Sequence, residues 1–381
     1  MRRAIRLAMN GRGRVEPNPM VGCVVVKGGR LIGEGRHEQF GGPHAEPNAL
    51  AACTEPPAGA TVYVTLEPCC HTEKKTPPCV PALVAAKVAR VVVGAIDPDP
   101  RVNGRGVAQL RAAGVTVDGP VLGAESMQLL APFVAHVVHR RPYVTLKWAQ
   151  SGDGRVAGRL GRRVRITGDA SDRIVHALRA RCDAIAVGTN TVLNDDPLLT
   201  ARPADGGARP LLRVVLSNSL KVPPASRLVR SAREHPVVVY CSASGAAFRG
   251  ESVAALRAAG VDVVPLPDRD AHFSFADVLA DLHARGVVHL LVEPGPTLAR
   301  SLLERGQADR VWVFRSRNTL DEAGALAAPS APPVDYPTTG AFAVDADDTL
   351  TEFLNPASPV FFAPEPSADF VLESGAQQSV G

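Results

Sequence analysis

Aromatic side chains and net charge are both scarce in this chain. Phenylalanine, tryptophan and tyrosine together make up 4% of its 381 residues, and the formal net charge is only +4. Proteins that hold unpaired bases combine stacking rings with a basic groove. This composition therefore argues against a dedicated nucleic-acid surface, although it leaves a local basic patch open. We expect no nucleic-acid partner.

Long apolar runs are missing as well. No segment approaches the roughly 20 apolar residues that a membrane helix requires, so we expect no membrane partner. The basic start of the chain is not followed by the apolar core of a signal peptide. Seven cysteines, an odd number, then favour reduced thiols in the cytoplasm over a disulfide framework.

Length and patterning predict two α/β domains. Hydrophobic residues form 45% of the sequence and charged residues 21%, the balance of a globular protein, and the length exceeds that of one ordinary core. Strand patterns alternate with helix patterns, which favours mostly parallel sheets covered on both faces. We place the linker at Arg140-Arg141-Pro142, between domains over 1–140 and 143–381. Alanine and proline dominate after residue 320, and we expect 321–381 to be irregular.

Individual elements follow from apolar periodicity. In the first domain we expect helices over 4–9, 45–52, 80–89, 106–113 and 121–138, and strands over 21–26, 30–34, 61–66, 90–96 and 115–118. In the second we expect strands over 143–147, 183–188, 212–216, 237–240, 261–264, 287–292 and 310–314, and helices over 171–180, 252–258, 275–284 and 297–304.

One histidine and two cysteines in the first domain are candidate metal ligands. His44 opens an expected helix, and Cys69 and Cys79 follow an expected strand. Three such ligands leave the fourth tetrahedral position of zinc open for water, as in catalytic sites. Glu46 is spaced as a proton shuttle, and H-x-E followed by P-C and a later cysteine is the signature of zinc-dependent base deaminases. A closed structural site completed by His71 is the alternative.

Four stretches of the first domain, residues 17–23, 42–46, 63–69 and 76–79, resemble those of a known family. They are similar to the bifunctional enzymes of riboflavin biosynthesis, in which a pyrimidine deaminase is fused to a reductase. The long spacer that ends in Thr76-Pro77-Pro78-Cys79 sets this group apart from nucleoside and tRNA deaminases. The resemblance implies a cytidine-deaminase-like α/β/α domain and then a dihydrofolate-reductase-like α/β domain.

The resemblance implies Zn²⁺ and NADPH as cofactors. It makes His44, Cys69 and Cys79 the zinc ligands and Glu46 the proton shuttle, with Asn18 as a substrate contact. Cys70 stands where the family usually has serine. It could replace Cys69, because counting back from Cys79 it restores the usual spacing.

In the second domain no G-x-G-x-x-G follows a first strand, so a Rossmann domain is not supported. Instead, Gly295-Pro296-Thr297 opens a helix directly after a strand, where backbone N–H groups suit phosphates. The resemblance implies substrate contacts at Arg163, Arg179, Leu199, Arg202 and Glu293. It implies cofactor contacts at Ala149, Arg165, Thr191, Asp195, Asn218, Gly295, Pro296, Thr297, Leu298, Ala299, Arg300 and Ser301.

Two reactions follow from the resemblance. The first is hydrolytic deamination of 2,5-diamino-6-(5-phosphoribosylamino)pyrimidin-4(3H)-one, and the second is NADPH-dependent reduction of the ribosyl to the ribityl side chain. The expected partner is this small phosphorylated pyrimidine, and a homo-oligomer stays open. The alternatives are a zinc deaminase acting on tRNA or another base with a non-catalytic second domain, and a non-catalytic zinc-stabilised module.

Overall fold

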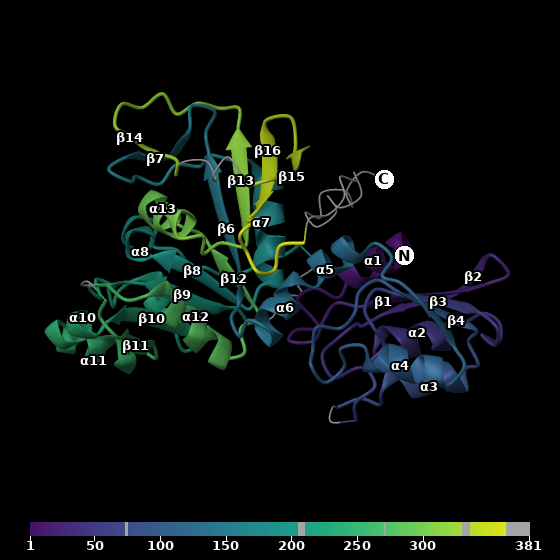
Figure 1. Ribbon diagram of the computed structural model, residues 1–381. Helices are drawn as coiled ribbons and strands as arrows, with labels where there is room; N and C mark the ends of the chain where they lie inside the picture. Colours follow the sequence, from purple (N-terminus) through teal and green to yellow (C-terminus); the bar gives the residue numbers. More distant parts are fainter. Residues whose placement is uncertain (73–74, 205–209, 270–271, 330–335, 363–381) are drawn as a thin grey trace. The chain divides into compact units, whose positions relative to one another are not determined.

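The computed structural model describes residues 1–72, 75–204, 210–269, 272–329 and 336–362. These residues form two compact units, one over Met1–Arg140 with Phe362 and the other over Arg141–Phe361. Both units carry helices packed on a β-sheet (Figure 1), so the predicted α/β class is confirmed. Within the described parts of the chain, no helix combines the length and apolar character needed to cross a membrane.

The first unit is built on a five-stranded sheet. Its strands are β1 (Gly22–Lys27), β2 (Arg30–Arg36), β3 (Thr61–Val64), β4 (Arg90–Val93) and β5 (Thr116–Asp118). Their order is β2-β1-β3-β4-β5. β1 and β2 form an antiparallel hairpin that turns at Gly28 and Gly29, both with positive φ. β1 also runs antiparallel to β3, and only β3, β4 and β5 are parallel to one another. The helices are α1 (Arg2–Met9), α2 (Ala45–Ala51), α3 (Cys79–Ala85), α4 (Arg105–Ala112), α5 (Gly123–Leu129) and α6 (Ala131–Val137).

Glycines in the strands let two helices approach the sheet closely from opposite sides. A Cβ at Gly22 of β1 would lie 2.0 Å from the Ala4 carbonyl oxygen of α1. On β2, a Cβ at Gly33 or Gly35 would lie 2.5 or 2.4 Å from the backbone of Ala49 in α2. Successive strand residues face opposite ways. Because Gly22 pairs with Arg36 and Gly35 with Cys23, α1 and α2 cover different faces.

The prediction of a single helix over 121–138 is wrong, since α5 and α6 are separate helices. Pro132 lies in the first turn of α6. Proline has no N–H to donate to the carbonyl four residues before it, so it starts a new helix more readily than it continues one.

The second unit is built on a nine-stranded sheet. Its strands, in sheet order, are β11 (Asp262–Leu266), β10 (Val237–Ser242), β9 (Leu212–Leu216), β8 (Ala184–Gly188), β12 (His289–Val292), β6 (Tyr143–Gln150), β13 (Arg310–Ser316), β16 (Asp348–Leu354) and β15 (Thr338–Ala343). The strands from β11 to β13 are parallel, as predicted, and β16 and β15 continue antiparallel. The helices are α7 (Asp169–Arg181), α8 (Thr189–Asp195), α9 (Arg227–Arg230), α10 (Ala243–Phe248), α11 (Gly250–Ala258), α12 (Phe275–Ala284) and α13 (Pro296–Glu304).

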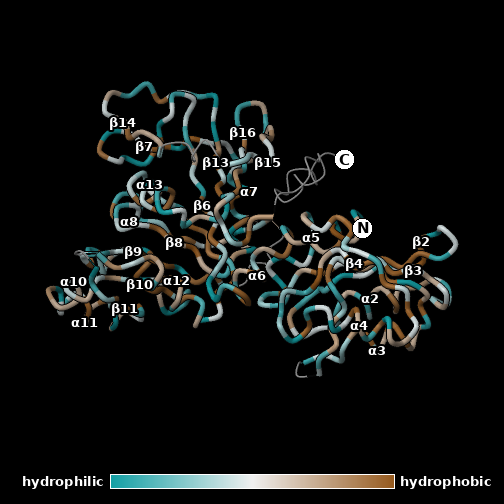
Figure 2. Tube along the Cα trace, in the orientation of Figure 1, coloured by the Kyte–Doolittle hydropathy of each residue, from teal (hydrophilic) through white to brown (hydrophobic). Residues whose placement is uncertain are grey.

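The large sheet has a hydrophobic core on each face. Val214 and Val215 are neighbours on β9 but pack into different buried clusters, and Val238 and Val239 on β10 do the same. Side chains alternate across a strand, so both faces of the sheet are covered. The central strands accordingly run as hydrophobic segments in Figure 2.

The region expected to be irregular contains three strands. β14 (Ala325–Ala327) pairs with β7 (Arg155–Arg159) in a separate two-stranded ribbon, and β15 and β16 extend the main sheet. β16 alternates buried and half-buried residues, but two of its buried side chains are acids, Asp348 and Glu352. Because acids occupy two of the inward positions, the sequence lacks the apolar alternation by which a strand is recognised. The segment predicted to be irregular also includes residues 330–335 and 363–381, which lie outside the described residues.

Asp348 caps a helix that is distant in sequence. Its Oδ2 accepts hydrogen bonds from the Gly168 amide and the Ser171 hydroxyl, both at 2.7 Å, at the start of α7. Gly168, the N-cap residue, offers no side chain of its own. A carboxylate at a helix N-terminus satisfies free N–H groups and complements the helix dipole.

We predict that Asp348→Ala destabilises the second unit by about 1–3 kcal/mol, because it removes the carboxylate that caps α7 and leaves the buried Ser171 hydroxyl without this acceptor. Calorimetry of the full chain should show the melting transition of that unit fall by several degrees, at roughly 2–4 °C per kcal/mol. The matched control is Asp347→Ala, since that side chain is exposed. Equal melting temperatures for the two variants would contradict the cap.

Candidate functional site

Three predicted metal ligands converge in the first unit. His44 Nδ1, Cys69 Sγ and Cys79 Sγ lie 3.4 Å from one another in every pairing. His44 is the N-cap of α2, Cys79 is the first residue of α3, and Cys69 lies in the loop after β3. Zinc bonds of roughly 2.0–2.3 Å place tetrahedral donors about 3.5 Å apart. Two sulfurs and one imidazole nitrogen at this spacing fit a zinc ion.

Cys70 and His71 stand outside this triangle. Among the described residues, the group of side chains able to share one metal ion contains His44, Cys69 and Cys79 alone. The geometry therefore favours Cys69 over Cys70 as the middle ligand. A three-ligand site also matches the open coordination of catalytic zinc better than the closed structural alternative.

Glu67 anchors the loop that carries Cys69. Its buried carboxylate accepts three backbone amides, from Asp97 at 3.1 Å, Gly104 at 2.8 Å and Val107 at 3.0 Å. The loop is tied to α3 as well, because the Cys79 amide donates to the Cys69 carbonyl at 3.0 Å. The sequence reasoning missed this role of Glu67. The available signal was an acid placed directly before Pro-Cys at the end of an apolar strand.

Glu46 lies in the first turn of α2 and is 3% exposed. Burial raises the pKa of its carboxyl group to about 7, and the charge of Cys69 acts in the same direction against that of His44. A carboxyl group with such a pKa can both accept and release a proton near neutral pH.

A cavity of about 250 Å³ opens onto these residues, and Asn18, the predicted substrate contact, is among its lining residues. Asn18 Nδ2 lies 3.1 Å from His37 Nε2, and His37 Nδ1 lies 2.9 Å from the Pro43 carbonyl oxygen. Since the carbonyl can only accept, Nδ1 carries the proton and Nε2 accepts from the amide. His37, which the sequence reasoning missed, thus sets the orientation of the Asn18 amide.

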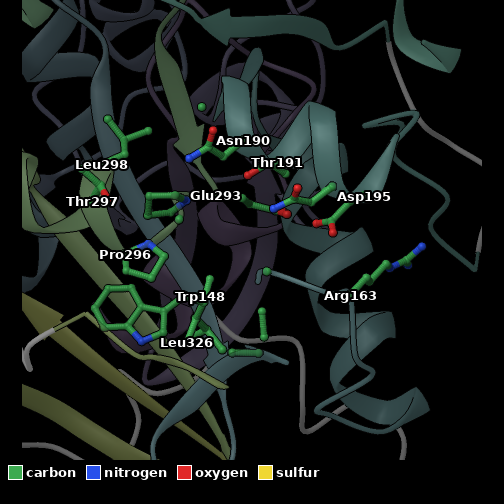
Figure 3. Close-up of a pocket in the computed structure, with 18 of the residues that line it drawn as sticks. Trp148, Arg163, Asn190, Thr191, Asp195, Glu293, Pro296, Thr297, Leu298 and Leu326 are labelled. Carbon is green, nitrogen blue, oxygen red and sulfur yellow. The ribbon is translucent and has the colours of Figure 1, made fainter. Parts of the chain in front are cut away.

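The second unit has a larger cavity, of about 1190 Å³ (Figure 3). Predicted contact residues that line it are Ala149, Arg163, Arg165, Thr191, Asp195, Asn218, Glu293, Gly295, Pro296, Thr297, Leu298 and Ser301. Predicted contact residues that are not among its lining residues are Arg179, Leu199, Arg202, Ala299 and Arg300.

Arg179 is held by a carboxylate rather than presented to the cavity. Its Nε and Nη2 donate to the two Glu293 oxygens at 2.8 and 2.7 Å. Burial alone would raise the pKa of Glu293, but the charges of Arg179 and Lys147 outweigh it and lower the pKa to about 2. Glu293 is therefore an ionised group at the cavity, flanked by the charges of Arg179 and Lys147.

Two other predicted substrate contacts also point elsewhere. Arg202 Nη2 lies 3.0 Å from His176 Nε2, and its Nη1 donates to Thr200 Oγ1 at 2.9 Å. The side chain of Leu199 packs into the hydrophobic core at 4% exposure. The order of the matching motifs along the sequence identifies the loop that carries Leu199 and Arg202. It does not give the direction of their side chains.

The start of α13 supplies the phosphate-binding geometry expected from the sequence. Gly295 is the N-cap with an extended backbone, Pro296 lies in the first turn, and no side chain caps the amides there. Thr297 and Leu298 of the same turn line the cavity. Free N–H groups and the positive end of a helix favour anions. With the size of the cavity, this end suits a dinucleotide such as NADPH.

Two arginines border the same cavity. Arg165 is engaged with acids of α7, donating from Nη2 to Asp169 and, at 3.2 Å, to Asp172. Arg163 also lines the cavity and lies on the same side of it as Asp195 (Figure 3). Burial raises the pKa of Asp195 and the nearby charge of Arg163 opposes that rise. Arg163 is thus a cation close to Asp195 among the residues that line the cavity.

Family models match both halves of the chain. One described as the cytidine and deoxycytidylate deaminase zinc-binding region matches residues 1–95, and one described as the RibD C-terminal domain matches residues 142–316. The riboflavin biosynthesis protein RibD of Aquifex aeolicus is 39% identical over 322 residues, or 84% of this chain and 87% of that protein. RibD of Escherichia coli is 38% identical over 327 residues, or 82% and 86%.

Solved structures agree with this match. A Thermotoga maritima protein, described as a diaminohydroxyphosphoribosylaminopyrimidine deaminase and 5-amino-6-(5-phosphoribosylamino)uracil reductase, superposes with a TM-score of 0.78 at 33% identity, over 93% of this chain and 97% of that one. Acinetobacter baumannii RibD, form 1, gives 0.77 at 33% identity, over 92% and 97%. The chain therefore belongs to the RibD family of riboflavin biosynthesis, as a bifunctional enzyme with a zinc-dependent deaminase domain and an NADPH-dependent reductase domain.

Proposed function

We propose that residues 1–140 form the deaminase domain and residues 143–381 the reductase domain. The substrate of the first is 2,5-diamino-6-(5-phosphoribosylamino)pyrimidin-4(3H)-one, and the second reduces the ribosyl side chain of the deaminated product to ribityl. A small phosphorylated pyrimidine, and not a nucleic acid, is thus the partner. The convergence of His44, Cys69 and Cys79 at 3.4 Å, with Glu46 in the same cavity, carries this proposal.

Different residues of the first unit have different roles in deamination. His44, Cys69 and Cys79 would hold the zinc ion, which when bound would supply a water that ionises near neutral pH. Glu46 takes up a proton and returns it to the departing amino group, a task for which its buried position suits it. Asn18, oriented by His37, holds the pyrimidine edge in the cavity.

The residues of the second unit place cofactor and substrate side by side. NADPH supplies the hydride when bound in the large cavity. The first turn of α13, from Gly295 to Leu298, would meet its phosphates, with Thr191 and Asp195 of α8 on the opposite wall. Glu293, kept ionised and rigid by Arg179, faces the substrate. Arg163, which also lines the cavity, meets the phosphate of the substrate.

The test of the deaminase assignment is Glu46→Gln in the full chain. Ammonia release from the diaminopyrimidine should fall by roughly 10²–10⁴-fold, because the proton shuttle is lost. Bound zinc, measured by atomic absorption, should stay unchanged, and so should NADPH oxidation with the deaminated intermediate. The exposed Glu38→Gln is the matched control. Unchanged ammonia release in Glu46→Gln would remove this residue from the reaction.

The middle zinc ligand is tested by comparing adjacent cysteines. Cys69→Ser should lower zinc content steeply, because one of three thiolate or imidazole donors is lost. Cys70→Ser should keep zinc and deamination, since its thiol lies outside the triangle. Metal analysis of both purified variants decides between them, and zinc loss in Cys70→Ser alone would reverse the assignment.

Arg163→Gln tests phosphate recognition in the reductase. The KM for the deaminated, phosphorylated substrate should rise by about tenfold or more, since a hydrogen bond to a charged group is worth roughly 1.5–3 kcal/mol. The kcat should change little. Arg173→Gln, at an exposed position of α7, is the control. A rise confined to the KM for NADPH would assign Arg163 to the cofactor instead.

A further inference from the structure

The imidazole ring of His44 is held at both of its nitrogens. Nδ1 faces the sulfurs of Cys69 and Cys79 at 3.4 Å each. Nε2 lies 3.1 Å from the hydroxyl oxygen of Thr76. The ring of His37 meets that of His44 edge-on, with centroids 5.2 Å apart and planes at 62°. The orientation of the ring is therefore set by contacts on three sides.

The chemistry of a metal ligand decides where the ring proton lies. A nitrogen that binds zinc must offer its lone pair, so the proton of neutral His44 belongs on Nε2. Nε2–H then donates to the Thr76 hydroxyl oxygen, which has lone pairs to accept it. Turning the ring over would break this bond and point a carbon at the two sulfurs.

Thr76 and one of the thiol ligands share a stiff segment. Pro77 and Pro78 separate Thr76 from Cys79, and Pro78 is the N-cap of α3 with φ −66° and ψ 150°. Each proline ring fixes its own φ. The hydroxyl that holds His44 is thus placed by the same short stretch that places Cys79.

A second contact ties this loop to the segment before His44. The ammonium of Lys75 lies over the ring of Phe40, 4.1 Å from its centroid. An ammonium over an aromatic face is attracted by the electron-rich ring. The loop therefore closes against the region that leads into α2, which keeps the Thr76 hydroxyl near the histidine.

We propose that Thr76 is a positioning residue of the zinc site. By accepting a hydrogen bond from His44 Nε2, it holds the imidazole with Nδ1 directed at the ion and thereby tightens zinc binding. The inference rests on the proposed zinc site of the first unit, but it does not depend on which pyrimidine is the substrate. Thr76 also borders the cavity, so activity alone would not separate positioning from substrate contact.

The test is zinc affinity in the full chain, measured by competition with a coloured chelator. Thr76→Val keeps the shape of the side chain and removes the hydroxyl, and it should weaken zinc binding roughly 10–100-fold, the usual effect of losing such a partner. Thr76→Ser restores the hydroxyl and should bind zinc like the unmodified protein. Thr72→Val, at an exposed position of the same loop, should have no effect.

A second readout separates positioning from folding. The visible absorption bands of the cobalt-substituted protein should shift in Thr76→Val and not in Thr76→Ser, and urea unfolding of the metal-free proteins should coincide. If Thr76→Val does not fold, Thr76→Ala takes its place. Zinc affinity unchanged by removal of the hydroxyl, or lowered as much by serine as by valine, would overturn the inference. Tight zinc binding with this ranking but no ammonia release would instead overturn the proposed function and leave Thr76 in its role.

Discussion

The first unit depends on bringing three metal donors from three separate segments to within 3.4 Å of one another. Two of them stand at helix starts, His44 before α2 and Cys79 at the head of α3. The positive end of a helix stabilises a thiolate, the form that binds metal. The close approach of α2 to β2 over Gly33 and Gly35 serves the same end, because a bulkier strand would displace the helix that carries His44 and Glu46.

In the second unit, an ion pair holds a residue of the large cavity in place. Glu293 borders the large cavity while its two oxygens are held by Arg179, whose side chain is 15% exposed. Removing one member of such a pair leaves an uncompensated charge, which is far more costly than the pair itself. Arg179, predicted as a substrate contact, is therefore held by Glu293, which lines the cavity.

Much of the zinc site and of the large sheet could be predicted from the sequence. The elements and side-chain directions that could not be predicted share physical causes. His44, Glu46 and Cys69 could be identified because residue type and order encode zinc chemistry directly. Strands of the large sheet were found where both faces are apolar. β16 was missed because its inward positions include Asp348 and Glu352, whose partners come from distant strands and helices. The burial of the Leu199 side chain could not be predicted, because the direction of a loop side chain depends on tertiary packing, which single-chain patterns do not contain.

The cap on α7 has a consequence for the order in which the protein is made. Ser171 and the carboxylate that holds it are 177 positions apart in the chain. A ribosome releases residues from the N-terminus onward, and domains formed early can fold while synthesis continues. The donors of the zinc site emerge within the first 79 residues, so that half can mature during translation. The reductase half must wait until β16 has left the exit tunnel before the start of α7 can be capped.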